Sequence, residues 1–124
     1  MEIRFENKVA FITGAAGGIG YAAARMFAEA GASVVMADLD SRVTDRAKEL
    51  EAEGHNAIGI RCDVSDEVQV KAAVEKAVAV FGKLDIAYNN VGIHAAVRED
   101  LAETEGWDFD RVISVNLRGV WNCM

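Results

Sequence analysis

Short apolar runs alternate along the chain with longer segments in which apolar residues recur every three or four positions. The runs occupy residues 9–12, 34–37, 57–60 and 84–88, and each has the length of one buried strand. The segments between them have the period of helices. Strands that alternate with helices predict β-α-β units and a parallel sheet, so the chain is of the α/β class.

Glycines and capping residues mark the predicted ends of the helices. The apolar positions of the first helix are Ile19, Ala22, Ala23, Met26, Phe27 and Ala30, and the helix stops at Gly31. A charged helix with the weaker stripe Val43, Ala47 and Leu50 ends at Gly54. The third helix buries Val70, Val74, Ala77, Val78 and Phe81 between an N-cap at Ser65 and a stop at Gly82. Thr104 caps a last helix that carries Phe109, Val112, Ile113, Asn116 and Val120.

The order of these elements predicts a Rossmann-like doubly wound parallel sheet between two helical layers, a three-layer αβα fold. Right-handed crossovers with a break beside the first strand give the strand order 3-2-1-4. Gly14, Asp38, Asp63 and Asn90 each lie just past a strand, and the carboxyl ends of parallel strands meet at one edge of a sheet. We therefore expect a ligand at this edge, bordered by a long loop over residues 94–103.

A glycine-rich turn joins the first strand to the first helix. It reads Thr-Gly-Ala-Ala-Gly-Gly-Ile-Gly over residues 13–20. Gly14 allows a sharp exit from the strand, Gly18 leaves the backbone open to a phosphate, and Gly20 lets the helix pack closely on the strand. The turn predicts a diphosphate site at a helix N-terminus, formed by Gly14, Ala16, Gly17, Gly18, Ile19 and Gly20.

An acidic residue, Asp38, follows the second strand at about the 20-residue distance at which a carboxylate binds the ribose of a dinucleotide. The same carboxylate repels a 2′-phosphate, so Asp38, with Leu39 beside it, favours NAD over NADP as the cofactor. Arg42 is a nearby cation that weakens this preference. The alternative is that Asp38 only starts a turn.

Composition excludes several classes of protein. The 124 residues are 52% hydrophobic and carry a net charge of −7, which argues against a nucleic-acid or anionic-membrane partner. No apolar run reaches the roughly 20 residues of a membrane span, and the first six residues do not resemble a secretory signal. Cys62 and Cys123 are expected to be reduced, near-core residues of a cytoplasmic protein. His55 and His94 lack ligand spacing, so no metal site is expected.

Several ordered motifs together resemble the short-chain dehydrogenase/reductase family. The turn at residues 13–20 matches its TGxxxGIG motif, Asp38 its NAD-selecting acid, and Cys62-Asp63-Val64 its adenine-binding segment. Asn89-Asn90-Val91-Gly92 matches NNAG, with Val91 in place of the usual alanine. The resemblance implies that Asp63 and Val64 contact adenine and that Asn90, Val91 and Gly92 line the nicotinamide-side ribose. We expect Thr13 and Asn89 to tie the first and fourth strands together.

The resemblance also implies one catalytic residue, Asn116, whose counterpart holds a water that relays protons to an active-site lysine. The alternative is a core asparagine that caps a backbone group. The serine and the Tyr-x-x-x-Lys catalysts of the family have no counterpart before Met124. Tyr21 and Arg25 share the Tyr-x-x-x-base spacing, but we interpret them as ordinary surface residues of the first helix.

The sequence therefore predicts the NAD-binding portion, residues 1–124, of an oxidoreductase that interconverts a small-molecule alcohol and its ketone. The missing catalysts, an uncapped last helix and an exposed fourth strand indicate a fragment truncated at its C-terminal side. Exposed apolar residues of that helix predict a homo-oligomer. The alternative is a non-catalytic fragment that binds NAD or self-associates, and no residue before Met124 identifies the substrate.

Overall fold

A computed structural model describes residues 2–96 and 100–124, and its strands form one parallel sheet in the order β3-β2-β1-β4. The strands are β1 Val9–Thr13, β2 Ser33–Asp38, β3 Ala57–Arg61 and β4 Ile86–Tyr88. The predicted strand order is confirmed. Each predicted strand is present, although β4 contains only 3 residues.

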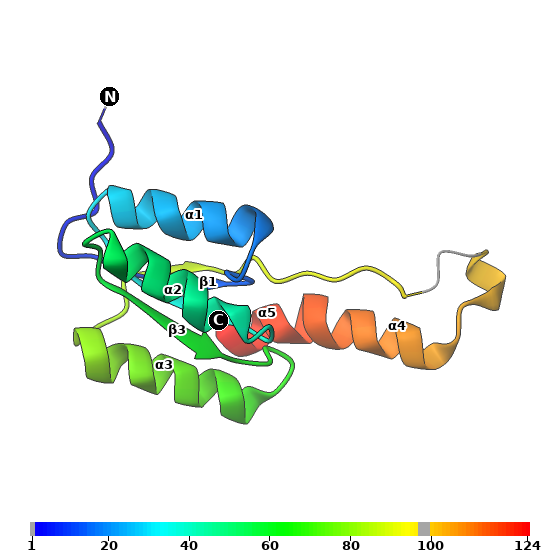
Figure 1. Ribbon diagram of the computed structural model, residues 1–124. Helices are drawn as coiled ribbons and strands as arrows, with labels where there is room; N and C mark the ends of the chain where they lie inside the picture. The colour runs from blue at the N-terminus through cyan, green and yellow to red at the C-terminus, as the bar shows by residue number, and fades with distance from the viewer. Residues whose placement is uncertain (1, 97–99) are drawn as a thin grey trace.

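Helices cover both faces of this sheet (Figure 1). They are α1 Gly18–Glu29, α2 Arg42–Ala52, α3 Glu67–Phe81, α4 Gly106–Ile113 and α5 Gly119–Cys123, with a 3₁₀ turn η1 at Leu101–Glu103 and a π-helical turn η2 at Ser114–Arg118. α1 and α2 pack on one face, and α3 and α5 on the other. None of these helices is long and apolar enough to cross a membrane, judged on the described residues.

The strands bury side chains on both faces, which is why their sequences are continuously apolar. In β1, Ala10 and Ile12 join the core beneath α1 and α2, whereas Val9 and Phe11 join the core beneath α3 and α5. Successive side chains of a strand point to opposite faces, so one strand serves two cores. This double burial fixes the sheet in the middle of three layers, as predicted.

The face that α1 turns to the sheet differs from its most hydrophobic positions. Ile19 and Met26 are 72% and 69% exposed, whereas Ala24 and Ala28 are buried together with Gly20. Small side chains let the helix axis approach the sheet closely at the glycine turn, and larger ones would hold it away. The helix was predicted correctly, and Phe27 packs against the core, but Ile19 and Met26 do not.

Two predicted helix caps lie one residue too early. The N-cap of α3 is Asp66, whose carboxylate accepts hydrogen bonds from the backbone N–H groups of Val68 and Gln69, whereas Ser65 bonds to Asp63. A carboxylate at a helix N-terminus also interacts favourably with the positive end of the helix dipole. At α4 the N-cap is a glutamate, the residue after the predicted threonine.

α4 and the segment before it extend away from the sheet (Figure 1). Phe109 and Ile113 of this helix are 62% and 40% exposed, in line with the exposed apolar residues expected on the last helix. The buried side chain of α4 is Asp108, at 1% exposure. Val78 of α3 is likewise 43% exposed, against its predicted burial.

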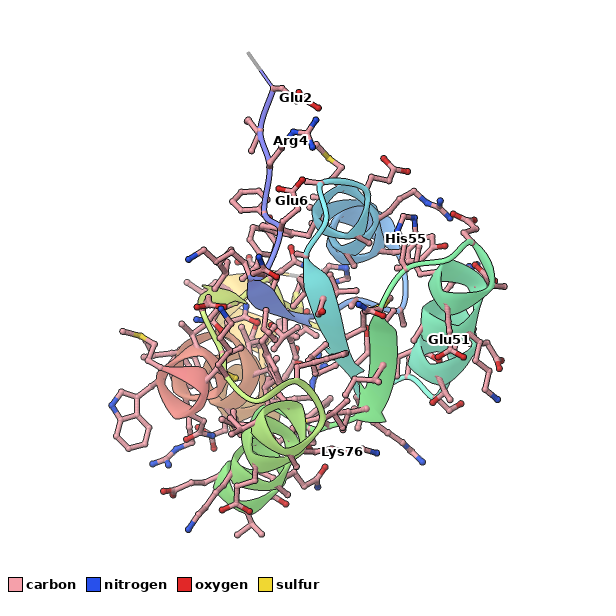
Figure 2. All side chains as sticks on the ribbon, turned by 90° about the vertical axis from the view of Figure 1, so that its left-hand side faces the viewer. Glu2, Arg4, Glu6, Glu51, His55 and Lys76 are labelled. Carbon is pink, nitrogen blue, oxygen red and sulfur yellow. The ribbon has the colours of Figure 1, made fainter. Side chains whose placement is uncertain are left out.

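The N-terminal segment lies beyond α1, with Glu2, Arg4 and Glu6 along it (Figure 2). Arg4 pairs with both glutamates, at 2.7 Å and 2.8 Å. Exposed ion pairs of this kind stabilise a fold little. Two contacts hold the segment: the ring of Phe5 packs 5.2 Å from that of Phe27, and the Phe5 N–H donates to the Ala30 carbonyl at 2.8 Å.

Candidate functional site

A cleft of about 540 Å³ opens at the carboxyl ends of the strands. It is lined by Gly14, Asp38, Leu39, Asp40, Cys62, Asp63, Val64, Asn90, Val91, Gly92, Ile93 and Val115. They include all the predicted cofactor-binding residues at the ends of β2, β3 and β4, whereas Gly14 is the only one from the glycine turn. Parallel strands bring these loops together because their carboxyl ends share one edge of the sheet.

One buried hydroxyl ties the start of the glycine turn to the segment after β4. Thr13 Oγ1 accepts hydrogen bonds from the backbone N–H groups of Asn90 at 3.0 Å and Val91 at 3.3 Å. Gly14 then leaves the strand with a φ of +68°, which a glycine adopts without strain. A Cβ at Gly20 would lie 2.0 Å from the Gly14 carbonyl oxygen, so helix and turn touch, as predicted.

The start of α1 fits a bound diphosphate. Gly17, Gly18 and Ile19 are exposed, and a Cβ built at either glycine meets nothing within 4 Å. The helix has no side-chain cap and no acidic residue in its first turn. Its first N–H groups are therefore left for a ligand, and their positive dipole end favours an anion. Ala16 is buried, so only its backbone is placed to contact a ligand.

Asp38 is held between the glycine turn and its own loop. Oδ2 accepts a hydrogen bond from Ala16 N at 3.0 Å, and Oδ1 accepts one from Asp40 N at 2.9 Å. The carboxylate therefore starts a turn and also lines the cleft, and its role in binding a ribose stays a prediction. Each carboxylate oxygen has a further lone pair with which it can accept a hydrogen bond from a ligand hydroxyl.

Three arginines contact this acidic corner, namely Arg42, Arg46 and Arg61. Arg42 is engaged by Asp40, at 2.9 Å from Nε and 2.8 Å from Nη2, and this contact holds the pKa of Asp40 below its usual value. Arg46 Nε donates to the Ala16 carbonyl at 3.2 Å. Arg46 was not predicted as part of the site, although it lies one helical turn after Arg42 and that spacing places both on one side of the helix.

The segment after β3 is fixed from two sides. Asp63 Oδ1 accepts from the backbone N and the hydroxyl of Ser65, at 3.0 Å and 2.6 Å. The carbonyl of Val64 accepts from Asn122 Nδ2 at 2.8 Å, and a Cβ at Gly119 would lie 2.6 Å from the Val64 side chain. α5 thus presses on the predicted adenine wall, a role of Asn122 that nothing in its local sequence indicates.

Asn89 does not make the predicted bridge between β1 and β4. Its Oδ1 is buried without a hydrogen-bond partner among the described residues, and the link runs through the Thr13 hydroxyl instead. A hydroxyl at the end of β1 reaches the backbone of the neighbouring segment directly, so no longer side chain is needed.

Asn116 bonds to one residue of the cleft wall. Its Nδ2 donates to the Ile93 carbonyl at 2.7 Å, and its Oδ1 accepts from the Ile93 N–H at 2.8 Å. It lies in the π-helical turn η2 and is exposed, not on a buried apolar face as expected. This geometry agrees with the alternative in which the asparagine caps backbone groups. The catalytic role of Asn116 stays a prediction.

Two further polar residues tie the same segment to α4. Asp108 accepts from Ala96 N with both oxygens, at 3.1 Å and 3.0 Å, and Arg111 donates to the His94 carbonyl at 3.1 Å. Arg111 also pairs with Asp108 at 3.0 Å. Part of the predicted substrate loop is therefore anchored, while its residues 97–99 lie outside the described residues.

Tyr21 and Arg25 lie on the surface of α1, as interpreted from the sequence, and they also link two helices. Tyr21 donates to Glu49 of α2 at 2.9 Å, and Arg25 donates to Tyr21 at 3.0 Å and to Glu53 at 2.7 Å. The guanidinium of Arg25 lowers the pKa of Glu53. The pair therefore joins α1 to α2 beside the glycine turn.

Both cysteines are free thiols, and Cys62 lies in the cleft wall. Burial raises the pKa of Cys62 to about 11, so it stays protonated and unreactive near neutral pH. This agrees with the predicted near-core position.

Comparison with known proteins gives consistent matches. Residues 8–124 match the sequence profile of a family described as short chain dehydrogenase. Borneol dehydrogenase, mitochondrial, of Lavandula x intermedia is 46% identical over 119 residues, which are 95% of this chain and 44% of that protein. Secoisolariciresinol dehydrogenase of Forsythia intermedia is 44% identical over 122 residues, which are 98% of this chain and 43% of that protein.

Among solved structures, a short chain dehydrogenase/reductase from Burkholderia phymatum in complex with NAD has a TM-score of 0.92 at 38% identity. The match covers 98% of this chain and 43% of that one. The chain thus spans less than half the length of the curated relatives it matches.

Proposed function

The chain belongs to the short-chain dehydrogenase family, and from this premise we propose that it is the NAD-binding portion of an oxidoreductase. The reaction is oxidation of a small-molecule alcohol or reduction of the corresponding ketone. The observation that carries the proposal is Asp38, a carboxylate fixed at 3.0 Å from the backbone of the glycine turn, in the cleft wall. A ribose diol beside an uncapped helix N-terminus matches this arrangement.

Each part of the cleft then has one task. The turn residues Gly14, Ala16, Gly17, Gly18, Ile19 and Gly20 hold the diphosphate, Asp38 and Leu39 the adenosine ribose, Asp63 and Val64 the adenine, and Asn90, Val91 and Gly92 the nicotinamide ribose. NAD, when bound, supplies a hydride acceptor at its nicotinamide ring. Asn116 fixes Ile93 on both backbone groups, and in this proposal it belongs to the catalytic set.

A titration of the 124-residue chain with NAD and with NADP tests the cofactor assignment. We expect tighter binding of NAD. Asp38→Asn keeps the shape of the side chain but removes its charge, so NAD should bind roughly 10- to 100-fold more weakly, the size of a lost charge-assisted hydrogen bond. The preference over NADP should fall as well. Asp45→Asn, in the first turn of α2, is the matched loss of charge and should change neither affinity.

The outcomes of this titration separate the possibilities. Equal affinity for NAD and NADP contradicts the selective role of Asp38. Absence of binding by either nucleotide contradicts the cofactor assignment as a whole.

A non-catalytic, self-associating module is the second candidate, favoured by the apolar side chains of the α4–α5 region. Trp107, Leu117 and Trp121 are 54%, 65% and 63% exposed. An exposed apolar surface of this kind is typical of a protein–protein interface, and we propose that a second copy of the chain buries it. Light scattering that gives a monomer at all concentrations would contradict this part. Supplying the family's serine and Tyr-x-x-x-Lys segment, in cis or in trans, separates the two functions, because only the enzyme portion then yields NADH.

A cytoplasmic location completes the proposal. The free thiols of Cys62 and Cys123 support it, because an oxidising compartment favours disulfides. Fractionation of cells with an antibody to the native protein tests it.

A further inference from the structure

A guanidinium of α2 sits against the glycine turn and has no part in the function proposed so far. Arg46 Nε donates to the carbonyl of Ala16 at 3.2 Å. Its Nη1 forms an ion pair with Glu49 at 3.2 Å, and its guanidinium carbon lies 5.0 Å from the centre of the Tyr21 ring. These contacts come from the turn, from α1 and from α2, so the cation is held in place before any ligand arrives.

Side chains of opposite charge contact the two backbone groups of Ala16. The N–H of Ala16 donates to Asp38 Oδ2 at 3.0 Å, while its carbonyl accepts from Arg46. A single residue, Ala16, therefore lies between the proposed ribose-binding carboxylate and a cation. Any group attached to the ribose at this corner experiences both charges, because an exposed charge acts over several ångströms in water.

The other arginines of the corner are placed differently. The Nε and Nη2 of Arg42 are both taken by the carboxylate of Asp40, at 2.9 Å and 2.8 Å. Arg61 donates to the Leu39 carbonyl at 3.0 Å from β3, and β3 lies on the side of β2 away from β1 and its turn. Arg46 is the arginine that contacts the glycine turn itself.

We propose that Arg46 is a second determinant of cofactor selectivity, a cation that attracts the 2′-phosphate of NADP and thereby opposes Asp38. This inference rests on the proposed dinucleotide site. A 2′-phosphate adds nearly two negative charges at the adenosine ribose, and arginine is the side chain that typically accommodates it. The balance between Asp38 and Arg46 then sets how strongly the chain prefers NAD.

The test is the ratio of the NAD and NADP dissociation constants, measured by calorimetry on the 124-residue chain. Asp38→Asn serves as the background, because NADP binding is easiest to measure without the repelling carboxylate. Adding Arg46→Gln should weaken NADP roughly fivefold more than NAD, the size of an exposed charge contact. Arg46→Lys keeps the charge but not the geometry and should retain most of the ratio.

Lys48→Gln is the matched control, since it removes the same charge from the exposed side of the same helix. The ratio should stay within about twofold of the background value in this variant. A merely structural Arg46 would weaken NAD and NADP equally, so an unchanged ratio in Arg46→Gln overturns the inference and leaves the proposed function intact. If the unsubstituted chain binds neither nucleotide, the proposed function fails, and this inference fails with it.

Discussion

Gly20 is the position at which a single methyl group should do most damage. A Cβ there would lie 2.0 Å from the carbonyl oxygen of Gly14 and 2.8 Å from Asn90 Nδ2. Ordinary contacts begin at 3.4 Å, so in Gly20→Ala the start of α1 must retreat by about 1.4 Å, and a backbone obstacle cannot rotate aside as a side chain can.

The cost of this retreat can be bounded. Overpacking costs about 1–3 kcal/mol, and we expect the upper end here. Alanine recovers about 0.5–1 kcal/mol of helix stability relative to glycine. The free energy of unfolding should therefore fall by about 2 kcal/mol, and the melting temperature by about 8 °C at roughly 4 °C per kcal/mol.

Urea unfolding followed by far-UV circular dichroism measures this change. Gly106→Ala is the matched control, because a Cβ at the start of α4 meets nothing within 4 Å, and its stability should be unchanged or slightly higher. If Gly20→Ala unfolds at the same urea concentration as Gly106→Ala, then α1 does not rest on the turn as closely as the structure has it, and the reasoning is refuted.

Three further changes test other contacts. Thr13→Val should lower the free energy of unfolding by about 2 kcal/mol, because two backbone N–H groups lose their acceptor. Thr13→Ser keeps the hydroxyl and should keep most of the unfolding free energy in the same urea assay. Asn116→Ala should speed hydrogen exchange of the Ile93 amide at least several-fold, whereas equal exchange rates would mean that another group protects it. Burial raises the pKa of Cys62 from 9.0 to about 11. The folded state thus holds this proton more tightly, and the free energy of unfolding should fall as pH rises from about 9 to about 11, a decline that Cys62→Ala should flatten in urea titrations.

The sequence by itself determined the fold and the residues at the edge of the sheet. Apolar runs of strand length, separated by helical segments, leave a parallel sheet as the arrangement that buries both strand faces. Gly14 and Asp38 were predictable because their roles depend on strand ends, and these can be located from the local pattern. The same local reasoning was less successful for helix faces, since Ile19 is exposed while Ala24 is buried.

Only the tertiary structure decided which side chains hold the cleft in shape. Arg46 meets Ala16 across 30 residues, and Asn122 meets Val64 across 58. A polar side chain on a helix looks alike in sequence whether it faces water or the backbone of a distant loop. Its role follows from where packing brings that loop, and packing is set by the close approach of whole helices at small residues such as Gly20 and Gly119.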